Sequence, residues 1–286
     1  MMRKKPMLAY PVSAKPIDYN EPVFIQPKLD GVRCLIQCED FQHHGKVIKA
    51  YSRTGKEWKN IRHILEELKP FFQKHPNVIL DGELYNHDLK NDFEKIISLV
   101  RKTKPTAEDR VESAEMVQFH CYDIINEELN YNQRDNFIKN EVPHIYCIKH
   151  LHASIVKDDE HAKLLHKINL DAGYEGSIVR LNTPYQCKRS HSLRKFKDFS
   201  DAEAYIVGYE EGKGKRTGTL GKFIMQDEDG NKFGCPPGKG YNYEDLKDML
   251  SNIHEYMGQT ATFTYFERTK AGSYRHPHYK CVRNYE

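Results

Sequence analysis

The sequence predicts an α+β protein of two domains, in which a first domain with helices flanking largely antiparallel sheets is followed by a small β-barrel. Before residue 198, apolar residues at helical spacing alternate with short β-branched and aromatic runs. After residue 202, short strand candidates are separated by glycine-rich turns, which is typical of a small barrel. The length of 286 residues also exceeds the usual size of one domain. We expect domains over residues 1–199 and 200–286.

A lysine between two predicted strands opens the first domain. Residues 23–25 and 34–36 are short apolar runs, and Lys28 lies between them, just before a glycine turn. A lysine attacks phosphorus only as the free amine, so desolvation or a nearby positive charge such as Arg33 has to disfavour its ammonium form. The segment therefore suits a covalent nucleophile, although a solvated lysine in a surface turn would have the same local sequence.

Helices and strands alternate through the rest of the first domain. Apolar residues at helical spacing predict three amphipathic helices, over residues 59–75, 91–102 and 158–170. Apolar and aromatic runs predict strands at residues 78–80 and 119–124, and the segments 174–180 and 193–197 are each expected to contain a strand. Side chains two apart on a strand point the same way, so Lys195 and Lys197 are expected on one face.

The second domain is expected to begin at a hinge over residues 198–202. Strand candidates follow at residues 204–207, 222–226, 261–266 and 279–283, with one helix predicted over residues 243–257. The net charge of +3 is small, but Lys and Arg outnumber acids by nine to five over residues 188–222 and by five to two from residue 263 to the end. Such clusters suit a groove that follows phosphates, although ordinary solvated surface gives the same pattern.

Several classes of protein are excluded. The seven cysteines are irregularly spaced and the histidines lack zinc spacing, so neither disulfides nor zinc is indicated and reduced thiols are expected. No segment has the Walker A spacing of P-loop ATPases. No apolar run approaches the ~18 residues that span a bilayer, and the N-terminus lacks a signal-peptide pattern. We expect a cytoplasmic or otherwise intracellular protein, acting in the host cell if it is viral, that is not secreted and has no membrane partner.

Six segments resemble, in order and spacing, the motifs of the covalent nucleotidyltransferase superfamily, which contains ATP-dependent DNA ligases, RNA ligases and mRNA capping enzymes. The segments are residues 28–33, 52–55, 80–84, 119–124, 174–180 and 193–197. Small viral and bacterial ATP-dependent DNA ligases are the most similar branch, because of the Arg53 motif, the glycine-lysine loop over residues 212–221 and the run over residues 272–277. The resemblance implies an adenylation domain followed by an OB-fold domain.

The resemblance also implies an activity and its site residues. The implied reaction seals nicks in double-stranded DNA, with ATP and Mg²⁺ or Mn²⁺ as cofactors, through AMP linked to Lys28. The implied catalytic residues are Lys28, Lys195 and Lys197, and the implied metal ligands are Glu175 and Glu83. The implied nucleotide-binding residues are Gln26, Lys28, Arg33, Arg53, Glu83, Tyr122, Glu175, Lys195 and Lys197. The implied DNA-binding residues are Arg33, Arg53, Arg180, Lys213, Lys215, Arg216, Arg275 and Arg283.

Some alternatives remain open at the level of sequence. Gln26 stands where many ligases have a glutamate, and Phe119 rivals Tyr122 as the aromatic that stacks on adenine. An RNA ligase or a capping guanylyltransferase would share the first domain. A nucleic-acid-binding module without catalysis would lack Lys28, Glu175 or the lysine pair, all of which are present. We expect a monomer that acts on nicked duplex DNA.

Overall fold

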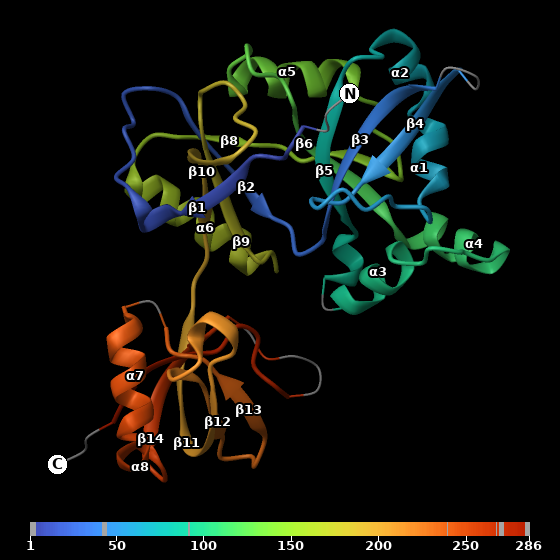
Figure 1. Cartoon of the computed structure of the whole chain (residues 1–286). Coiled ribbons are helices and arrows are strands. Elements are labelled where there is room, and N and C mark those ends of the chain that lie inside the picture. The colour runs from blue at the N-terminus through green and yellow to red at the C-terminus, as the bar shows by residue number, and fades with distance from the viewer. Residues whose placement is uncertain are drawn as a thin grey trace. The chain divides into compact units, whose positions relative to one another are not determined.

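The chain divides into two units, residues Met1–Lys197 and Asp198–Glu286, two residues before the boundary expected from the sequence (Figure 1). The computed structural model describes residues 4–41, 45–90, 92–238, 240–266, 268 and 272–283. Both units combine helices with mostly antiparallel sheet, which confirms the α+β class. Within the described residues, no helix is long and apolar enough to cross a membrane.

One sheet of the first unit carries the predicted nucleophile at a strand end. Its order is β1-β10-β9-β2-β8, with β1 parallel to β10 and the other pairs antiparallel. The strands are β1 (Leu8–Pro11), β2 (Val23–Lys28), β8 (Ser154–Val156), β9 (Gly176–Leu181) and β10 (Arg189–Phe196). The helix α6 (Asp159–Asp171) buries Ala162 against apolar side chains of β2, β8 and β9. Lys28 is therefore held at the end of a strand whose residues 23–26 are buried.

The second sheet of this unit has the order β4-β3-β5-β6-β7. Its strands are β3 (Val32–Phe41), β4 (Gly45–Tyr51), β5 (Ile79–Tyr85), β6 (Gln118–Ile124) and β7 (Ile148–His150). The helices α1 (Arg62–Glu67), α2 (Lys69–Lys74), α3 (Phe93–Val100), α4 (Ala107–Met116) and α5 (Tyr131–Glu141) belong to the same unit. A large apolar cluster, in which Ile64, Leu80 and Phe119 are fully buried, forms the core of this half.

Three helical features differ from the prediction. The helix expected over residues 59–75 is two helices, α1 and α2, because Pro70 lacks the backbone N–H that would bond to the carbonyl of Glu66. The helix expected over residues 91–102 is α3, and Asn91 lies outside the described residues. The helices α4 and α5 were not predicted, although each begins with a capping box, Thr106 with Asp109 and Asn130 with Gln133.

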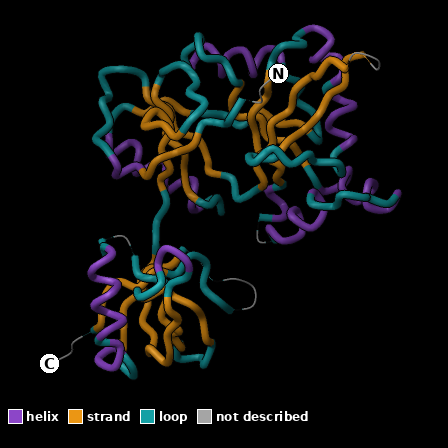
Figure 2. The backbone as a smooth tube through the Cα atoms, in the orientation of Figure 1, coloured by secondary structure: helices purple, strands orange, loops and turns teal. Residues whose placement is uncertain are grey.

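The described residues of the second unit form a five-stranded antiparallel sheet with two short α-helices (Figure 2). The strands, in the order β13-β12-β11-β14-β15, are β11 (Ser200–Glu211), β12 (Leu220–Gln226), β13 (Lys232–Cys235), β14 (Thr260–Tyr265) and β15 (His278–Val282). The predicted helix over residues 243–257 is α7 (Tyr243–Ser251) and α8 (Ile253–Tyr256). The predicted hinge was too long, because Ser200 already pairs with Tyr265 in the sheet.

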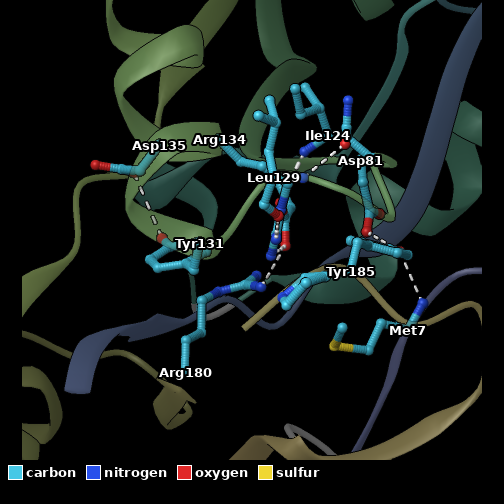
Figure 3. Close-up of polar contacts among 12 residues, drawn as sticks. Met7, Asp81, Ile124, Leu129, Tyr131, Arg134, Asp135, Arg180 and Tyr185 are labelled. Atoms are coloured by element: carbon cyan, nitrogen blue, oxygen red, sulfur yellow. Dashed lines mark hydrogen bonds and ion pairs between the residues drawn. The ribbon is translucent and has the colours of Figure 1, made fainter. Parts of the chain in front are cut away.

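A buried carboxylate joins the two sheets of the first unit, and Figure 3 shows its neighbours Arg134 and Arg180. Asp123, fully buried at the end of β6, accepts hydrogen bonds from Arg134 Nε of α5 at 2.6 Å and from Arg180 Nη1 of β9 at 2.7 Å. Arg134 also donates to the backbone carbonyls of Leu129 and Thr183. Charges this deeply buried require partners, so Asp123 fixes both arginines and, through them, one sheet against the other.

Replacing Asp123 by alanine is expected to destabilise the first unit by about 3–5 kcal/mol, because it leaves two buried guanidinium groups without their carboxylate. Urea unfolding followed by the fluorescence of Trp58, the single tryptophan, measures the change. The matched control is Glu127→Ala, which removes a half-exposed partner of Lys4 and should change the midpoint far less. Equal effects of the two substitutions would contradict the role of Asp123.

Candidate active site

The predicted nucleophile lies in an ion-paired cluster at the end of β2. Lys28 pairs in register with Gly176 of β9, and the backbone N–H of Glu175 donates to the carbonyl of Lys28 at 3.1 Å. The carboxylate of Glu175 forms ion pairs with Lys28 Nζ through one oxygen and with Lys197 Nζ through the other. Because the Glu175 side chain is only 5% exposed, the two ammonium groups replace most of its contact with water.

A cavity of about 290 Å³ opens beside this cluster. Apolar contacts come from Leu29, Leu151, Ile178 and Leu193, and charged or polar groups surround the rest. The predicted site residues that line it are Gln26, Lys28, Arg33, Arg53, Glu83, Tyr122, Arg180 and Lys195. A cavity with apolar contacts and convergent polar groups is the usual form of a small-molecule site.

Two glycines allow the motif segments to approach one another. A Cβ atom on Gly31, in the turn after Lys28, would lie 2.6 Å from Cγ of Glu83 and 2.5 Å from the carbonyl oxygen of Leu84. A Cβ atom on Gly176 would lie 2.4 Å from the carbonyl oxygen of Phe196, and its φ of +146° also favours glycine. Any side chain at these positions would push Glu83 or the end of β10 away from Lys28.

Lys195 and Lys197 approach the cavity from the end of β10. Lys195 pairs in register with Ile178 and lines the cavity, whereas Lys197 follows the strand and is held by Glu175. His166 of α6 supports this corner, because its ring stacks on Phe196 with a centroid distance of 3.8 Å and its Nδ1 lies 2.9 Å from Ser177 Oγ. Lys195 and Lys197 therefore both lie near Lys28, at the end of a strand that His166 supports.

Arg33 is fixed by a buried carboxylate. Its Nε and Nη2 contact the two oxygens of Asp81 at 2.6 and 2.5 Å, and Nη2 also donates to the carbonyl of Met7 at 3.2 Å. Tyr185 donates to Asp81 and accepts from the N–H of Met7, both at 2.7 Å (Figure 3). Burial raises the pKa of Asp81, although Arg33 opposes the shift. Arg33 is thus a rigid and largely neutralised part of the cavity.

Gln26 has a defined amide orientation. Arg180 Nε donates to Gln26 Oε1 at 2.6 Å, and Gln26 Nε2 donates to the carbonyl of Leu151 at 3.2 Å. Arg180 is itself 4% exposed and bound to Asp123. The guanidinium of Arg180 is thus enclosed between Gln26 and Asp123, and the DNA contact expected of Arg180 stays a prediction.

Tyr122 and Phe119 lie in different surroundings. Phe119 is fully buried in the apolar core, whereas Tyr122 lines the cavity. The Tyr122 ring centroid lies 5.2 Å from the guanidinium carbon of Arg33 and 5.3 Å from that of Arg180. Its hydroxyl donates to Glu83 Oε2 at 3.1 Å. Of the two aromatic side chains, only Tyr122 is therefore placed to contact a molecule in the cavity.

The remaining DNA-binding candidates lie on exposed or half-buried surface. Arg53 lies in a turn closed by the N–H of Gly55 bonding to the carbonyl of Ser52 at 2.9 Å, and it lines the cavity. In the second unit, the loop that follows β11 exposes Lys213, Lys215 and Arg216. Arg275 is half-buried, 5.8 Å from the Phe266 ring centroid, and Arg283 pairs with Glu203.

Sequence reasoning missed the residues that hold the site together. Asp81 and Asp123 belong to the motif segments and were passed over, although an aspartate within an apolar strand is itself a signal of a buried ion pair. Tyr185 and Arg134 had no local signal. Arg189 of β10 is a further cation that lines the cavity, and its Nη1 donates to the carbonyl of Ala9 at 2.5 Å.

The donor set fits a magnesium ion only in part. Within the described part of the chain, no three His, Cys, Asp or Glu side chains gather closely enough to form a metal site. Glu175 offers two carboxylate oxygens beside Lys28, and magnesium commonly takes one or two protein carboxylates and keeps several waters. Glu83 belongs to the same cavity but is bound by Tyr122. Glu175 is held by Lys28 and Lys197, so both glutamates are candidate ligands and each would exchange a present partner for the ion.

The site combines a lysine held by a glutamate with a cavity that contains further cations, an aromatic ring and a second carboxylate. This combination is that of a covalent nucleotidyltransferase. Residues 6–197 match the family model described as "ATP dependent DNA ligase domain", and residues 211–283 match the model described as "DNA ligase OB-like domain". The chain belongs to the ATP-dependent DNA ligase family, whose cofactor is ATP.

Curated relatives include DNA ligases of viruses. The chain is 32% identical over 215 residues to a DNA ligase of African swine fever virus, covering 71% of this chain and 48% of that protein. It is 26% identical over 304 residues to the DNA ligase of Enterobacteria phage T4, covering 88% of this chain and 62% of that protein. The chain thus spans about half the length of the African swine fever virus relative.

Solved structures share the fold over nearly the whole chain. A structure reported in a structure-function analysis of Lig E DNA ligases superimposes with a TM-score of 0.78 at 21% identity, covering 99% of this chain and 100% of that one. The ATP-dependent DNA ligase from bacteriophage T7, solved in complex with ATP, gives a TM-score of 0.52 at 19% identity over 92% of each chain. These likenesses confirm an adenylation domain followed by an OB-like domain.

Glu83 is expected to make stability depend on pH. Burial raises its pKa to about 7 from an ordinary value of 4.5, against the opposing effects of Arg33 and Lys28. The folded state then binds the proton of Glu83 more tightly than the unfolded state does. The contribution of this proton to the stability of the fold is complete below about pH 4.5 and is lost as the pH rises through about 7. Glu83→Gln should therefore be more stable relative to the wild type at pH 8 than at pH 5. Urea unfolding at the two pH values tests this, and a constant difference would contradict it.

Proposed function

We propose that this chain is an ATP-dependent DNA ligase that seals nicks between a 5′-phosphate and a 3′-hydroxyl in duplex DNA. The observation that carries the proposal is the position of Lys28, which is ion-paired to Glu175 at the edge of a cavity lined by the other motif side chains. Membership of the family supports it. So does the presence in one chain of both the adenylation and the OB-like domain.

In the proposed first step, the amine of Lys28 attacks the α-phosphorus of ATP, a P–N bond forms and pyrophosphate leaves. The transition state spreads negative charge over phosphoryl oxygens, so catalysis depends mainly on alignment and positive charge. Lys195 at the cavity and Lys197 at Glu175 supply that charge. The carboxylate of Glu175, already hydrogen-bonded to the amine, is placed to accept its proton. Magnesium or manganese bound at Glu175 would add positive charge beside the phosphates.

The rest of the cavity suits the adenosine part of ATP. Glu83 and the hydroxyl of Tyr122 offer polar atoms for the ribose, and the Tyr122 ring and Leu151 offer flat and apolar contacts for the base. In the second step AMP passes from Lys28 to the 5′-phosphate, and in the third the 3′-hydroxyl displaces AMP. Arg53 and Lys195, both exposed where they line the cavity, are the cations best placed to hold the entering phosphate.

The proposed partner is nicked double-stranded DNA, and the proposed active form is a monomer. The exposed cations of the loop after β11 offer sequence-independent contacts to a phosphate backbone. ATP and DNA occur together inside cells, so we propose an intracellular site of action.

Lys28→Ala should abolish formation of the labelled protein from ATP carrying ³²P at the α-phosphate, because the nucleophile is lost. The same variant should still seal a nick whose 5′-phosphate already carries AMP, since that step needs no lysine nucleophile. Gel assays of labelled protein and of sealed strand measure the two steps. Label retained on Lys28→Ala would refute the assignment of the nucleophile.

Sealing of a duplex with one 5′-phosphorylated nick tests the substrate. With magnesium, the wild type should seal an all-DNA nick with ATP and should seal it poorly with GTP. Replacing the 3′-hydroxyl strand by RNA measures the strand preference. Preferential sealing of the RNA strand would make the chain an RNA ligase, and labelling of Lys28 by GTP without sealing would make it a capping guanylyltransferase.

A further inference from the structure

The segment that carries Glu175 depends on support from the second sheet of the first unit. Residues 172–175 link the end of α6 to β9, and Gly173 within them has a φ of +86°. The N–H of Glu175 ties the segment to β2 through the carbonyl of Lys28. We propose that His87 is a positioning residue that ties the same segment to β5 and so holds Glu175 between Lys28 and Lys197. This inference rests on the proposed function.

The two ring nitrogens of His87 have fixed roles. Nε2 lies 3.1 Å from the carbonyl oxygen of Ala172, which can only accept, so Nε2 carries the proton. Nδ1 lies 2.8 Å from the hydroxyl of Tyr85, so in the neutral ring it accepts from that hydroxyl. One neutral tautomer therefore satisfies both contacts. The imidazole links a strand of the second sheet to the end of α6.

The ring of His87 also packs on the residue next to Glu175. Its centroid lies 4.4 Å from that of Tyr174, with an angle of 34° between the ring planes. Tyr85, the hydrogen-bond partner of His87, is 3% exposed and follows Glu83 by two positions on β5, so both side chains leave the same face of the strand. His87 thus sets the position of Glu175 relative to the strand that carries Glu83.

Loss of this support should affect the chemical step more than nucleotide binding. Glu83 and Tyr122, the residues proposed to hold the ribose and base, lie on β5 and β6, and Tyr174 packs against the apolar cluster that contains Tyr122. Glu175, which contacts Lys28, lies in the 172–175 segment itself. A displacement of about 1 Å in a reacting group can reduce a rate by about 100-fold. His87→Ala should therefore reduce the rate of lysine adenylylation by at least about 10-fold. It should change the KM for ATP by less than about threefold. It should also raise the magnesium concentration needed for half the maximal rate.

Two further variants separate positioning from a general loss of structure. His87→Gln retains a donor and an acceptor for Ala172 and Tyr85 and should recover part of the rate. The control is Lys90, whose Nζ also donates to the carbonyl of Ala172, at 3.1 Å. Lys90→Ala removes this hydrogen bond but leaves the packing of His87 on Tyr174 unchanged. It should leave the rate near that of the wild type. Thermal unfolding followed by Trp58 fluorescence checks that each variant is folded.

Rapid-quench measurement of lysyl-AMP formation, with ATP and magnesium varied separately, tests the inference on the full chain. A His87→Ala enzyme that is as fast as the wild type would overturn the role of His87. So would a loss confined to the KM for ATP, or an equal loss in Lys90→Ala. A wild-type chain that forms no lysyl-AMP would instead overturn the proposed function itself, so the two failures are distinguishable.

Discussion

The active site depends on a buried carboxylate that never contacts the proposed reaction. Asp123 binds Arg134 of α5 and Arg180 of β9, and Arg180 in turn orients the amide of Gln26 on β2. The cavity is lined by side chains from both sheets, so its shape requires that the sheets keep a fixed relation. Apolar packing alone is not directional. Ion pairs with defined hydrogen-bond geometry supply that fixed relation, since a misplaced sheet would leave a buried charge unpaired.

The buried aspartates also divide the cations of the site into two groups. Arg33 and Arg180 are bound by Asp81 and Asp123, and both lie beside the ring of Tyr122, so they serve as walls of the cavity. Arg53 and Lys195 line the same cavity from exposed positions. A phosphate that enters the cavity can reach these exposed cations, whereas the buried guanidinium groups of Arg33 and Arg180 already share their charge with carboxylates. Positive charge and rigidity are thus supplied by different residues.

Local patterns could predict much of the fold and the identity of the site. Lys28, Glu175 and the lysine pair stand in short segments with strong local patterns, and the structure brings them together. The helix over residues 59–75 was predicted as one element because apolar spacing does not register the missing N–H of Pro70. Tyr185 was missed for another reason. Its partners Asp81 and Met7 are distant in sequence, and no periodicity records which tyrosine reaches a buried carboxylate.

Glu175 has two electrostatic effects that oppose each other. Its carboxylate stabilises the ammonium form of Lys28, which cannot attack phosphorus, and it also fixes the amine at the edge of the cavity. Lys197 shares the carboxylate through the other oxygen and so weakens its hold on the proton of Lys28. Phosphates entering beside Lys195 would give Lys197 a second anionic partner. The site therefore holds the amine of Lys28 in place through a carboxylate that it shares with Lys197, and a substrate that adds negative charge would change how the two ammonium groups share it.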